Sequence, residues 1–194
     1  MSTQGDQTRK KIIDTVIELL KVKGYNGIGL QEIVKESGAP KGSLYFHFPG
    51  GKDEIVETAI KQQSENIDKL LRMLFLGAAD IATAIKMVMM YSINELESSG
   101  YTKGCPIGTT VLDPVSISNT ILESCAQCFS SMKDVIAERL IKDGFVAVEA
   151  EKQATFILSS LEGAIILSKA YRNTEPLKII AEQLSIFFAH QQTE

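Results

Sequence analysis

Tryptophan is absent from this chain of 194 residues, which has only five prolines, three cysteines and two histidines. Three cysteines cannot all pair, and a reducing compartment is consistent with that. No segment approaches the ~20 apolar residues that would span a bilayer. Asp14 and Glu18 interrupt the first apolar run, so it does not have the pattern of a signal peptide. We therefore expect a cytoplasmic protein.

Sequence motifs of catalysis and of metal binding are also scarce. There is no G-x-S-x-G, no glycine-rich phosphate loop and no His/carboxylate spacing suited to metal-assisted hydrolysis. Cys125 and Cys128 form a C-x-x-C, but they lie one turn apart on the apolar face of a predicted helix. Because a structural zinc site needs four ligands, buried thiols are the favoured interpretation, with a metal site as the alternative. Neither a cofactor nor a metal is expected.

The distribution of charge and apolar residues favours a helical protein with two regions. Hydrophobic residues make up 44% of the chain, and few stretches alternate as strands do. Residues 1–61 hold nine Lys/Arg and eight Asp/Glu, a balance of +1, whereas the remainder holds eleven and sixteen, a balance of −5, which together give the net −4. Affinity for arbitrary DNA through counterion release should therefore be modest, and a dimer that reads a defined site fits better.

Residues 24–52, GYNGIGLQEIVKESGAPKGSLYFHFPGGK, have the pattern of a helix-turn-helix. Gly38 would end a helix that starts at Leu30, because glycine takes the left-handed conformation at low cost. Pro40 lies where the next helix begins and where a missing N–H is tolerated. In that helix Leu44 and Phe48 share one face. The opposite side carries Lys41, Ser43, Tyr45 and His47 and no acid, as expected of a helix that lies in a major groove.

This stretch closely resembles the TetR family of bacterial transcriptional repressors. The family pattern is a glycine, a small apolar residue, K-G-x-L-Y-x-H-F and a lysine that opens the fourth helix; here these are Gly38, Ala39, residues 41–48 and Lys52. Gly29 and Pro40 replace the usual hydroxyl residues, so two possible N-caps are absent. The segments G-A-P-K-G-S-L-Y and P-G-G-K resemble the LmrA/YxaF-type branch, which contains repressors released by flavonoids or by lincomycin-like drugs.

The resemblance and the helical periodicity predict an all-α chain. Residues 1–52 would form a three-helix DNA-binding domain, and residues 53–194 a larger effector-binding and dimerisation domain. Helices are expected at about 8–23, 52–77, 80–98, 118–141, 148–172 and 175–190, in addition to the two of the helix-turn-helix. The segment 99–117, which contains Pro106 and Pro114, is expected to be an irregular and functional loop.

Six residues are the predicted DNA contacts: Gln31, Lys41, Ser43, Tyr45, His47 and Lys52. Lysine can bind guanine or a phosphate, and Tyr and His suit phosphate oxygens, which fix the register. The N-terminus that follows Lys52 could also hold a phosphate. The alternative is that Tyr45 and His47 only pack on the first helix. Residues 9–11, Arg-Lys-Lys, either lie near phosphates or form a solvated terminus.

The predicted effector pocket and dimer interface depend on residues that could equally fill a core. Methionines and aromatics suit adaptable apolar pockets. The pocket candidates are Phe75, Met87, Met90, Tyr91, Cys105, Pro106, Phe129 and Met132. The last two helices have more apolar surface than one core contact needs, and in the family they form the dimer interface. The interface candidates are Leu161, Gly163, Ala164, Ile180, Leu184 and Phe187.

Together these observations predict a homodimeric repressor that binds a pseudo-palindromic double-stranded DNA operator. A small, mostly apolar effector, flavonoid-like or drug-like, would bind beside residues 101–114, shift the fourth helix and release the DNA by linkage. The alternative is a ligand-binding or thiol-reactive enzyme without a role at DNA, which would need a cleft with a perturbed cysteine. A membrane is not expected as a partner.

Overall fold

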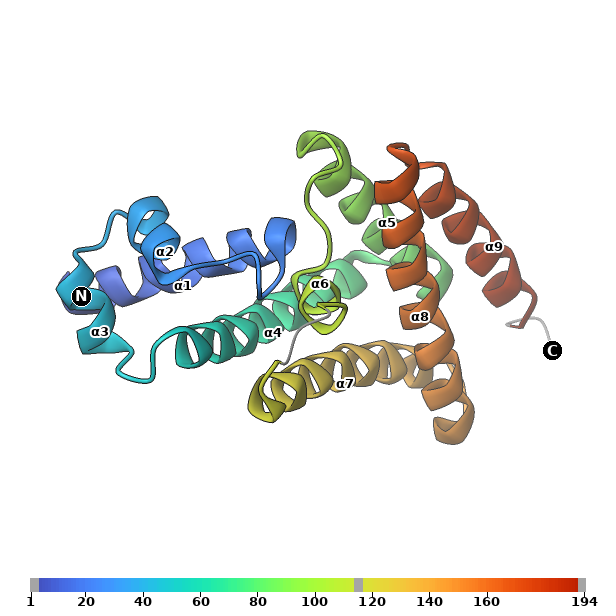
Figure 1. Ribbon diagram of the computed structural model, residues 1–194. Helices are drawn as coiled ribbons and strands as arrows, with labels where there is room; N and C mark the ends of the chain where they lie inside the picture. Colours follow the sequence, from blue (N-terminus) through green and yellow to red (C-terminus); the bar gives the residue numbers. More distant parts are fainter. Residues whose placement is uncertain (1–3, 114–116, 192–194) are drawn as a thin grey trace. The chain divides into compact units, whose positions relative to one another are not determined.

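The computed structural model describes residues 4–113 and 117–191, and within them the fold is all-helical, as predicted (Figure 1). The helices are α1 (Gln4–Lys23), α2 (Leu30–Ser37), α3 (Lys41–His47), α4 (Lys52–Gly77), α5 (Ile81–Ser98), α6 (Pro106–Val111), α7 (Asn119–Lys142), α8 (Ala147–Tyr171) and α9 (Glu175–Gln191). The predicted bounds of the long helices agree to within a few residues.

The segment 99–117 is more regular than its glycines and prolines indicated. Pro106 begins the short helix α6, because proline at a helix start gives up an N–H that has no partner there in any case. The buried Thr110 donates its hydroxyl to the carbonyl of Pro106 at 2.7 Å. The prediction of an irregular loop was therefore wrong for residues 106–111, and Pro114 lies outside the described residues.

The chain divides into two compact units that do not match the predicted boundary after residue 52. Of the described residues, 4–65, 106–113 and 117–129 form the first unit, and 66–105 and 130–191 form the second. The reason is that α6 packs on α1, and the backbone N–H of Asn26 donates to Asp113 at 2.7 Å. Helices α4 and α7 each contribute residues to both units.

The first unit has a core made by the inward faces of α1 to α4. Helix α1 contacts α2, α3 and α6. Its buried stripe follows the predicted helical period of about 3.6 residues. The fully buried side chains of this core include Ile12, Val16, Ile33, Leu44, Phe48, Ile55 and Ile60.

The second unit is built on α5, which packs against both α8 and α9. Asp80 caps α5, because its carboxylate accepts the backbone N–H of Thr83 at 2.7 Å. This hydrogen bond is the main reason that the pKa of Asp80 lies below its usual value. The buried side chains of this unit include Ile81, Ile85, Met89, Ile93, Ala154, Ile157, Leu161, Leu177, Leu184 and Phe188.

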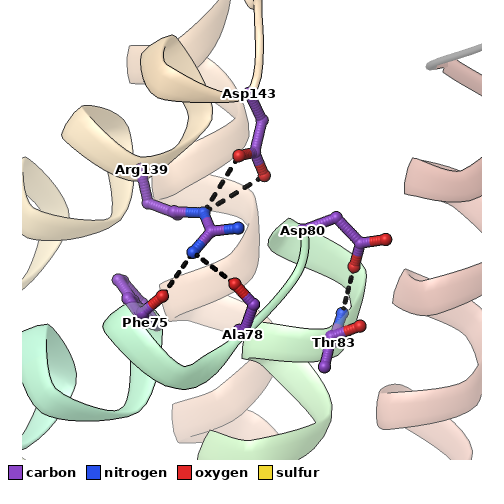
Figure 2. A network of polar contacts seen from close by, with 6 residues as sticks. All are labelled: Phe75, Ala78, Asp80, Thr83, Arg139 and Asp143. Carbon is purple, nitrogen blue, oxygen red and sulfur yellow. Dashed lines mark hydrogen bonds and ion pairs between the residues drawn. The ribbon is translucent and has the colours of Figure 1, made fainter.

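A buried arginine holds the end of α4 in the second unit (Figure 2). The last carbonyls of a helix have no partner within it. From α7, Arg139 donates to the carbonyls of Phe75 and Ala78, the latter at 3.2 Å. The other side of its guanidinium donates to both carboxylate oxygens of Asp143, at 3.0 and 3.2 Å. The end of α4 is thus satisfied by a side chain from α7.

Candidate functional site

The turn between α2 and α3 has the geometry that the sequence predicts. Gly38 has φ 61°, a left-handed conformation, and its N–H donates to the carbonyl of Val34 at 3.0 Å. The buried hydroxyl of Ser37 accepts the N–H of Ala39 at 3.2 Å. Pro40 precedes α3, and its carbonyl accepts the N–H of Ser43 at 2.9 Å. The turn is therefore fixed by backbone conformation and by one buried hydroxyl.

Helix α3 has a buried face and an exposed face. Leu44 and Phe48 are fully buried, as predicted. Lys41 and Tyr45 are exposed, the latter at 46%, whereas Ser43 and His47 are only partly exposed. The ring of His47 lies against those of Phe46 and Phe48, with centroids 5.1 and 6.4 Å apart.

The most exposed apolar side chain of α3 is Phe46, at 82%. Each residue of an α-helix turns by about 100°, so Phe46 points away from the side that Leu44 and Phe48 bury. It was not among the predicted contacts, because a division of this helix by polarity alone places it with the core residues. The angular position of Phe46 would have revealed its exposure.

Basic side chains accompany α3 on the neighbouring elements. The guanidinium of Arg9 lies 5.3 Å from the centroid of the Phe48 ring. Lys11 and Lys35 are exposed, as is the predicted contact Gln31 on α2. Lys10 is paired with Asp14 at 2.5 Å. Lys35 is likewise paired with Glu36, at 3.6 Å. Arg9 and Lys11 therefore supply positive charge on α1, which contacts α3, and α3 itself has no acidic residue.

Lys52 is held more firmly than the other predicted DNA contacts. Its ammonium lies 4.0 Å from the centroid of the Tyr25 ring, and partial burial lowers its pKa. Tyr25 in turn donates its hydroxyl to Asp53. Burial first, and this hydrogen bond second, raise the pKa of Tyr25 to about 12. Glu54 accepts the N–H of Gly50 at 2.7 Å, so the two acids serve the start of α4.

An apolar cavity of about 20 Å³ lies inside the second unit. It is lined by Leu71, Phe75, Ile81, Ile85, Val88, Met89, Met132, Ile136, Ile157 and Leu161. Phe75 and Met132 were predicted pocket residues. Ligand pockets typically have a volume of ~300–1,000 Å³, so a drug-sized molecule would enter this space only if the helices around it moved apart.

The other predicted pocket residues do not line this cavity. On α5, Met90 and Tyr91 are exposed and Met87 is half-buried, because the inner face of this helix is carried by Ile85 and Met89. Pro106 and Phe129 belong to the first unit. The buried side of α5 thus faces the cavity, and the pocket candidates on this helix lie outside that side.

The three cysteines have two different environments. Cys105 is half-buried, and its thiol hydrogen-bonds Glu162 on α8. Burial raises the pKa of Glu162, and the thiol contact opposes this shift. Cys125 and Cys128 are buried on α7, and burial is the main reason that the pKa of Cys125 is raised to about 11. Among the described residues no cluster of His, Cys, Asp and Glu could hold a metal ion.

The predicted dimer residues fall into two groups. Leu161, Ala164 and Leu184 are buried within their own subunit, because the inner sides of α8 and α9 form its core; Leu161 also lines the cavity. These three are not accessible to a partner. Gly163 and Ile180 are half-buried, and Phe187 is exposed. The exposed large apolar side chains nearby are Phe156, Ile166, Leu167, Ile179, Ile186 and Phe187.

The outer apolar residues of α8 and α9 meet at an aromatic pair. The rings of Phe156 and Phe187 are in edge contact, with centroids 6.0 Å apart. A side chain added at Gly163 would meet no atom within 4 Å.

None of the helices in the described part of the chain has the length and apolar character that a membrane crossing requires.

Two family models match this chain, one over each part. Residues 12–59 match the bacterial regulatory proteins of the tetR family. Residues 81–183 match the C-terminal domain of LmrA/YxaF-like transcriptional regulators. The uncharacterized HTH-type transcriptional regulator YxaF of Bacillus subtilis (strain 168) is 35% identical over 186 residues, which cover 96% of this chain and 97% of that protein. The HTH-type transcriptional regulator LmrA of the same strain is 32% identical over 173 residues, which cover 89% of this chain and 92% of that protein.

Solved structures agree on the fold. The reduced form of E. coli NemR has a TM-score of 0.82 at 21% identity, over 91% of this chain and 94% of that one. A cysteine mutant of the TetR family regulator CifR, in complex with 26-bp double-stranded operator DNA, has a TM-score of 0.77 at 18% identity, with coverage of 91% and 94%.

Proposed function

Because this chain belongs to the TetR family of DNA-binding transcriptional regulators, with an LmrA/YxaF-like C-terminal domain, we propose that it is a dimeric repressor released from its operator by a small, mostly apolar effector. The family consists of regulators and not of enzymes, which sets aside the catalytic alternative. A cytoplasmic location is part of the proposal.

The exposed face of α3 is the observation that carries the DNA-binding part of the proposal. In a helix-turn-helix the second helix enters the major groove. Lys41 and Tyr45 project from the exposed side of α3, and no acid on this helix would repel a phosphate. We assign base or phosphate contacts to Lys41 and phosphate contacts to Tyr45 and Gln31. Ser43, His47 and Lys52 take a smaller part, because each is partly buried.

Binding to a selected operator tests this assignment. A duplex is selected from a random DNA pool with the wild-type protein, and its affinity is measured by fluorescence anisotropy at several salt concentrations. Lys41→Ala should weaken binding, and the slope of log K against log salt should fall in magnitude by ~0.9 for each phosphate that the variant no longer neutralises. Lys86→Ala on α5, also exposed, is the matched control. Equal affinities for the wild type and Lys41→Ala would contradict the assignment.

The dimer is assigned to the outer faces of α8 and α9. Phe156, Gly163 and Leu167 recur at helical spacing along one side of α8, and Ile186 and Phe187 are exposed on α9. Contiguous exposed apolar surface of this kind is typical of a protein interface. The open space above Gly163 would allow a partner helix to approach closely.

Sedimentation tests the dimer. Phe187→Glu would place a charge without a partner in a desolvated contact and should give monomers. Leu76→Glu, at an 81% exposed position on α4, is the control and should remain a dimer. Ala164→Glu is unsuitable, because Ala164 is buried in its own subunit. A Phe187→Glu dimer as tight as the wild type would rule out this surface.

The effector is assigned to an enlarged form of the cavity in the second unit. Phe75 and Leu71 line it from α4, and α4 also contributes residues to the first unit. A ligand that separates these side chains would change the position of α4 and lower the affinity for DNA by linkage. The all-apolar lining, which includes two methionines, suits a planar, mostly apolar compound such as a flavonoid.

Two substitutions on α5 test the position of the effector. A panel of flavonoids and other planar compounds is screened by thermal shift and by release of the operator. Val88→Phe should fill the cavity and abolish the response to a compound that releases the wild type. Met90→Phe, on the exposed side of the same helix, should respond normally. If Val88→Phe responds at unchanged effector concentrations, the effector binds elsewhere.

A further inference from the structure

Phe46 is a solvent-exposed aromatic side chain at a position where most helices would carry a polar one. It is 82% exposed, whereas its neighbours Tyr45 and Phe48 are 46% and 0% exposed. It lies on the opposite side of the helix from Leu44 and Phe48, and its ring contacts that of the neighbouring His47. The packing of the subunit therefore does not explain why this position is apolar.

The surroundings of Phe46 restrict what could cover it. Gly42 lies one turn earlier on the same side of α3, and a side chain there would meet no atom within 4 Å. The ring therefore projects beside bare backbone, where another molecule could approach closely. Lys41 is exposed on the same short helix. A helix that exposes both a cation and an apolar ring suits a polyanion that also presents an apolar group.

Double-stranded DNA has one such group in its major groove. Each thymine exposes a C5-methyl group there, and phenylalanine is one of the side chains that contact it. Phe46 has no polar atom, so it cannot bond a phosphate oxygen or a base edge as Lys41 or Tyr45 can. A contact with the methyl would remove both apolar groups from water.

We propose that Phe46 is a specificity-determining residue that reads the C5-methyl group of one thymine in each operator half-site. The inference rests on the proposed function, in which α3 lies in the major groove. Lysine and tyrosine would fix the register through phosphates, and Phe46 would distinguish thymine from cytosine at one position by apolar contact alone. Because this contact involves no phosphate, it would contribute nothing to the salt dependence of the affinity for DNA.

Deoxyuridine tests the contact, because it differs from thymidine only by the missing methyl and keeps the same base pairing. Each thymine of the selected operator is replaced in turn, symmetrically in both half-sites, and the affinity is measured by anisotropy. Removing one buried methyl should weaken binding about fourfold, so the symmetric pair should weaken it about fifteenfold when the two contributions are independent. The wild type should show this loss at one thymine position per half-site.

Variants then assign the methyl to a side chain. Phe46→Ala should bind the thymine operator more weakly than the wild type and should bind the deoxyuridine operator as well as the thymine one. Lys41→Ala should bind both operators more weakly but retain the fifteenfold ratio. Circular dichroism should show unchanged folding of Phe46→Ala, since the side chain is exposed.

The outcomes separate this inference from the function on which it rests. Two outcomes would overturn the reading by Phe46 and leave α3 as the DNA-binding helix. In the first, Lys41→Ala loses affinity while Phe46→Ala keeps the full ratio of affinities for the thymine and deoxyuridine operators. In the second, no thymine is sensitive to loss of its methyl. If neither variant changes operator affinity, the placement of α3 in the groove fails as well. Uniform weakening of all operators by Phe46→Ala, with the ratio intact, would also overturn the reading, because the ring would then touch sugar instead of the base.

Discussion

The two units of this chain hold the ends of their helices in different ways. In the first unit, most of these helix ends are set by the backbone conformation of glycine and proline. Gly38 ends α2 at φ 61°, and Gly51 precedes α4 at φ 72°. Neither α2 nor α3 has a side-chain cap. In the second unit Gly100, Gly144 and Arg172 also have positive φ beside helix ends, but side chains act as well: Asp80 caps α5, and Arg139 binds carbonyls at the end of α4. The turn between α2 and α3 thus depends on local conformation, whereas the end of α4 depends on a residue more than 60 positions away in the sequence.

In the proposed function the first unit must keep the DNA-binding helix in place, whereas the second must respond to an effector. A turn fixed by glycine and proline conformations keeps α2 and α3 in one relative position with few side chains. A helix end held by Arg139 depends on α7 staying where it is, and α7 also supplies Met132 and Ile136 to the cavity. Movement around the cavity would therefore act directly on the groups that hold α4.

The largest effect is expected where the buried arginine is removed. Arg139→Met retains apolar bulk but leaves Asp143 and the carbonyls of Phe75 and Ala78 without their donor. Breaking a buried ion pair by removing one partner costs about 3–5 kcal/mol. Urea unfolding of the variant should show a loss of this size in the free energy of unfolding.

An exposed arginine in the same unit is the matched control. Arg72 on α4 pairs with Glu138 on α7 at 2.6 Å, and both side chains are more than half exposed. Solvent screens such pairs, so Arg72→Met should change the free energy of unfolding little. Equal losses for the two variants would show that the burial of Arg139 has no special importance.

A pair of glycine substitutions should change stability in opposite directions in the first unit. Gly38→Ala forces a Cβ into the left-handed region at about 1–2 kcal/mol, although only the flexible Lys11 lies near the added atom, at 3.4 Å. Gly42 is within α3, and an added Cβ there meets nothing, so Gly42→Ala should stabilise by about 0.5–1 kcal/mol. Thermal unfolding measures both, and a loss for Gly42→Ala as large as that for Gly38→Ala would contradict the conformational explanation.

The same contrast explains how much of the fold could be predicted from the sequence. The helix-turn-helix was predicted closely, because Gly38, Pro40 and the spacing of Leu44 and Phe48 act within a few residues. Helix α6 was missed, since the packing on α1 that stabilises it joins residues far apart in the sequence. Arg139 gave no sign of its role, because its carbonyl partners are 61 and 64 residues away.

The candidate sites follow the same rule. The exposure of Lys41 and Tyr45 follows from their angle on one short helix. The pocket candidates could not be fixed in the same way, because methionine and aromatic residues occur on both sides of α5: Met89 is buried, whereas Met90 and Tyr91 are exposed. For the dimer, Leu161 and Ala164 are as apolar as Leu167, and only the packed subunit shows which side of α8 its own core already covers.

A smaller effect is expected at the cap of α5. Asp80→Ala removes the acceptor for the N–H of Thr83 and should cost about 1 kcal/mol. The pKa of Asp80 is lowered in the folded state, so its contribution is fully present above the unfolded value, about 3.9, and is lost as the pH falls through the folded value. The difference between the wild type and Asp80→Ala in urea unfolding should shrink below about pH 4.

Asparagine at the same position separates the charge from the hydrogen bond. Asn caps helices about as well as Asp, so Asp80→Asn should keep most of the stability at pH 7 and lose little of it on acidification. A variant difference for Asp80→Ala that stays constant down to pH 2 would exclude a role for the ionised carboxylate.

The last effect is expected at Tyr25, whose side chain contacts the start of α4 in the first unit. Tyr25→Phe removes the hydrogen bond to Asp53 and should lower the free energy of unfolding by about 0.5–1.5 kcal/mol, while the aromatic face under Lys52 remains.

The pKa of Tyr25 is raised to about 12, mainly by burial, whereas the unfolded chain loses this proton near 10. The folded state therefore holds more protons between these values, and its stability falls as the pH rises through them. Urea unfolding at pH 8 and pH 11 should show the advantage of the wild type over Tyr25→Phe shrinking at the higher pH, since the other titrating groups are common to both proteins. An advantage that persists or grows at pH 11 would mean that the hydroxyl of Tyr25 does not stabilise the start of α4 in its protonated form.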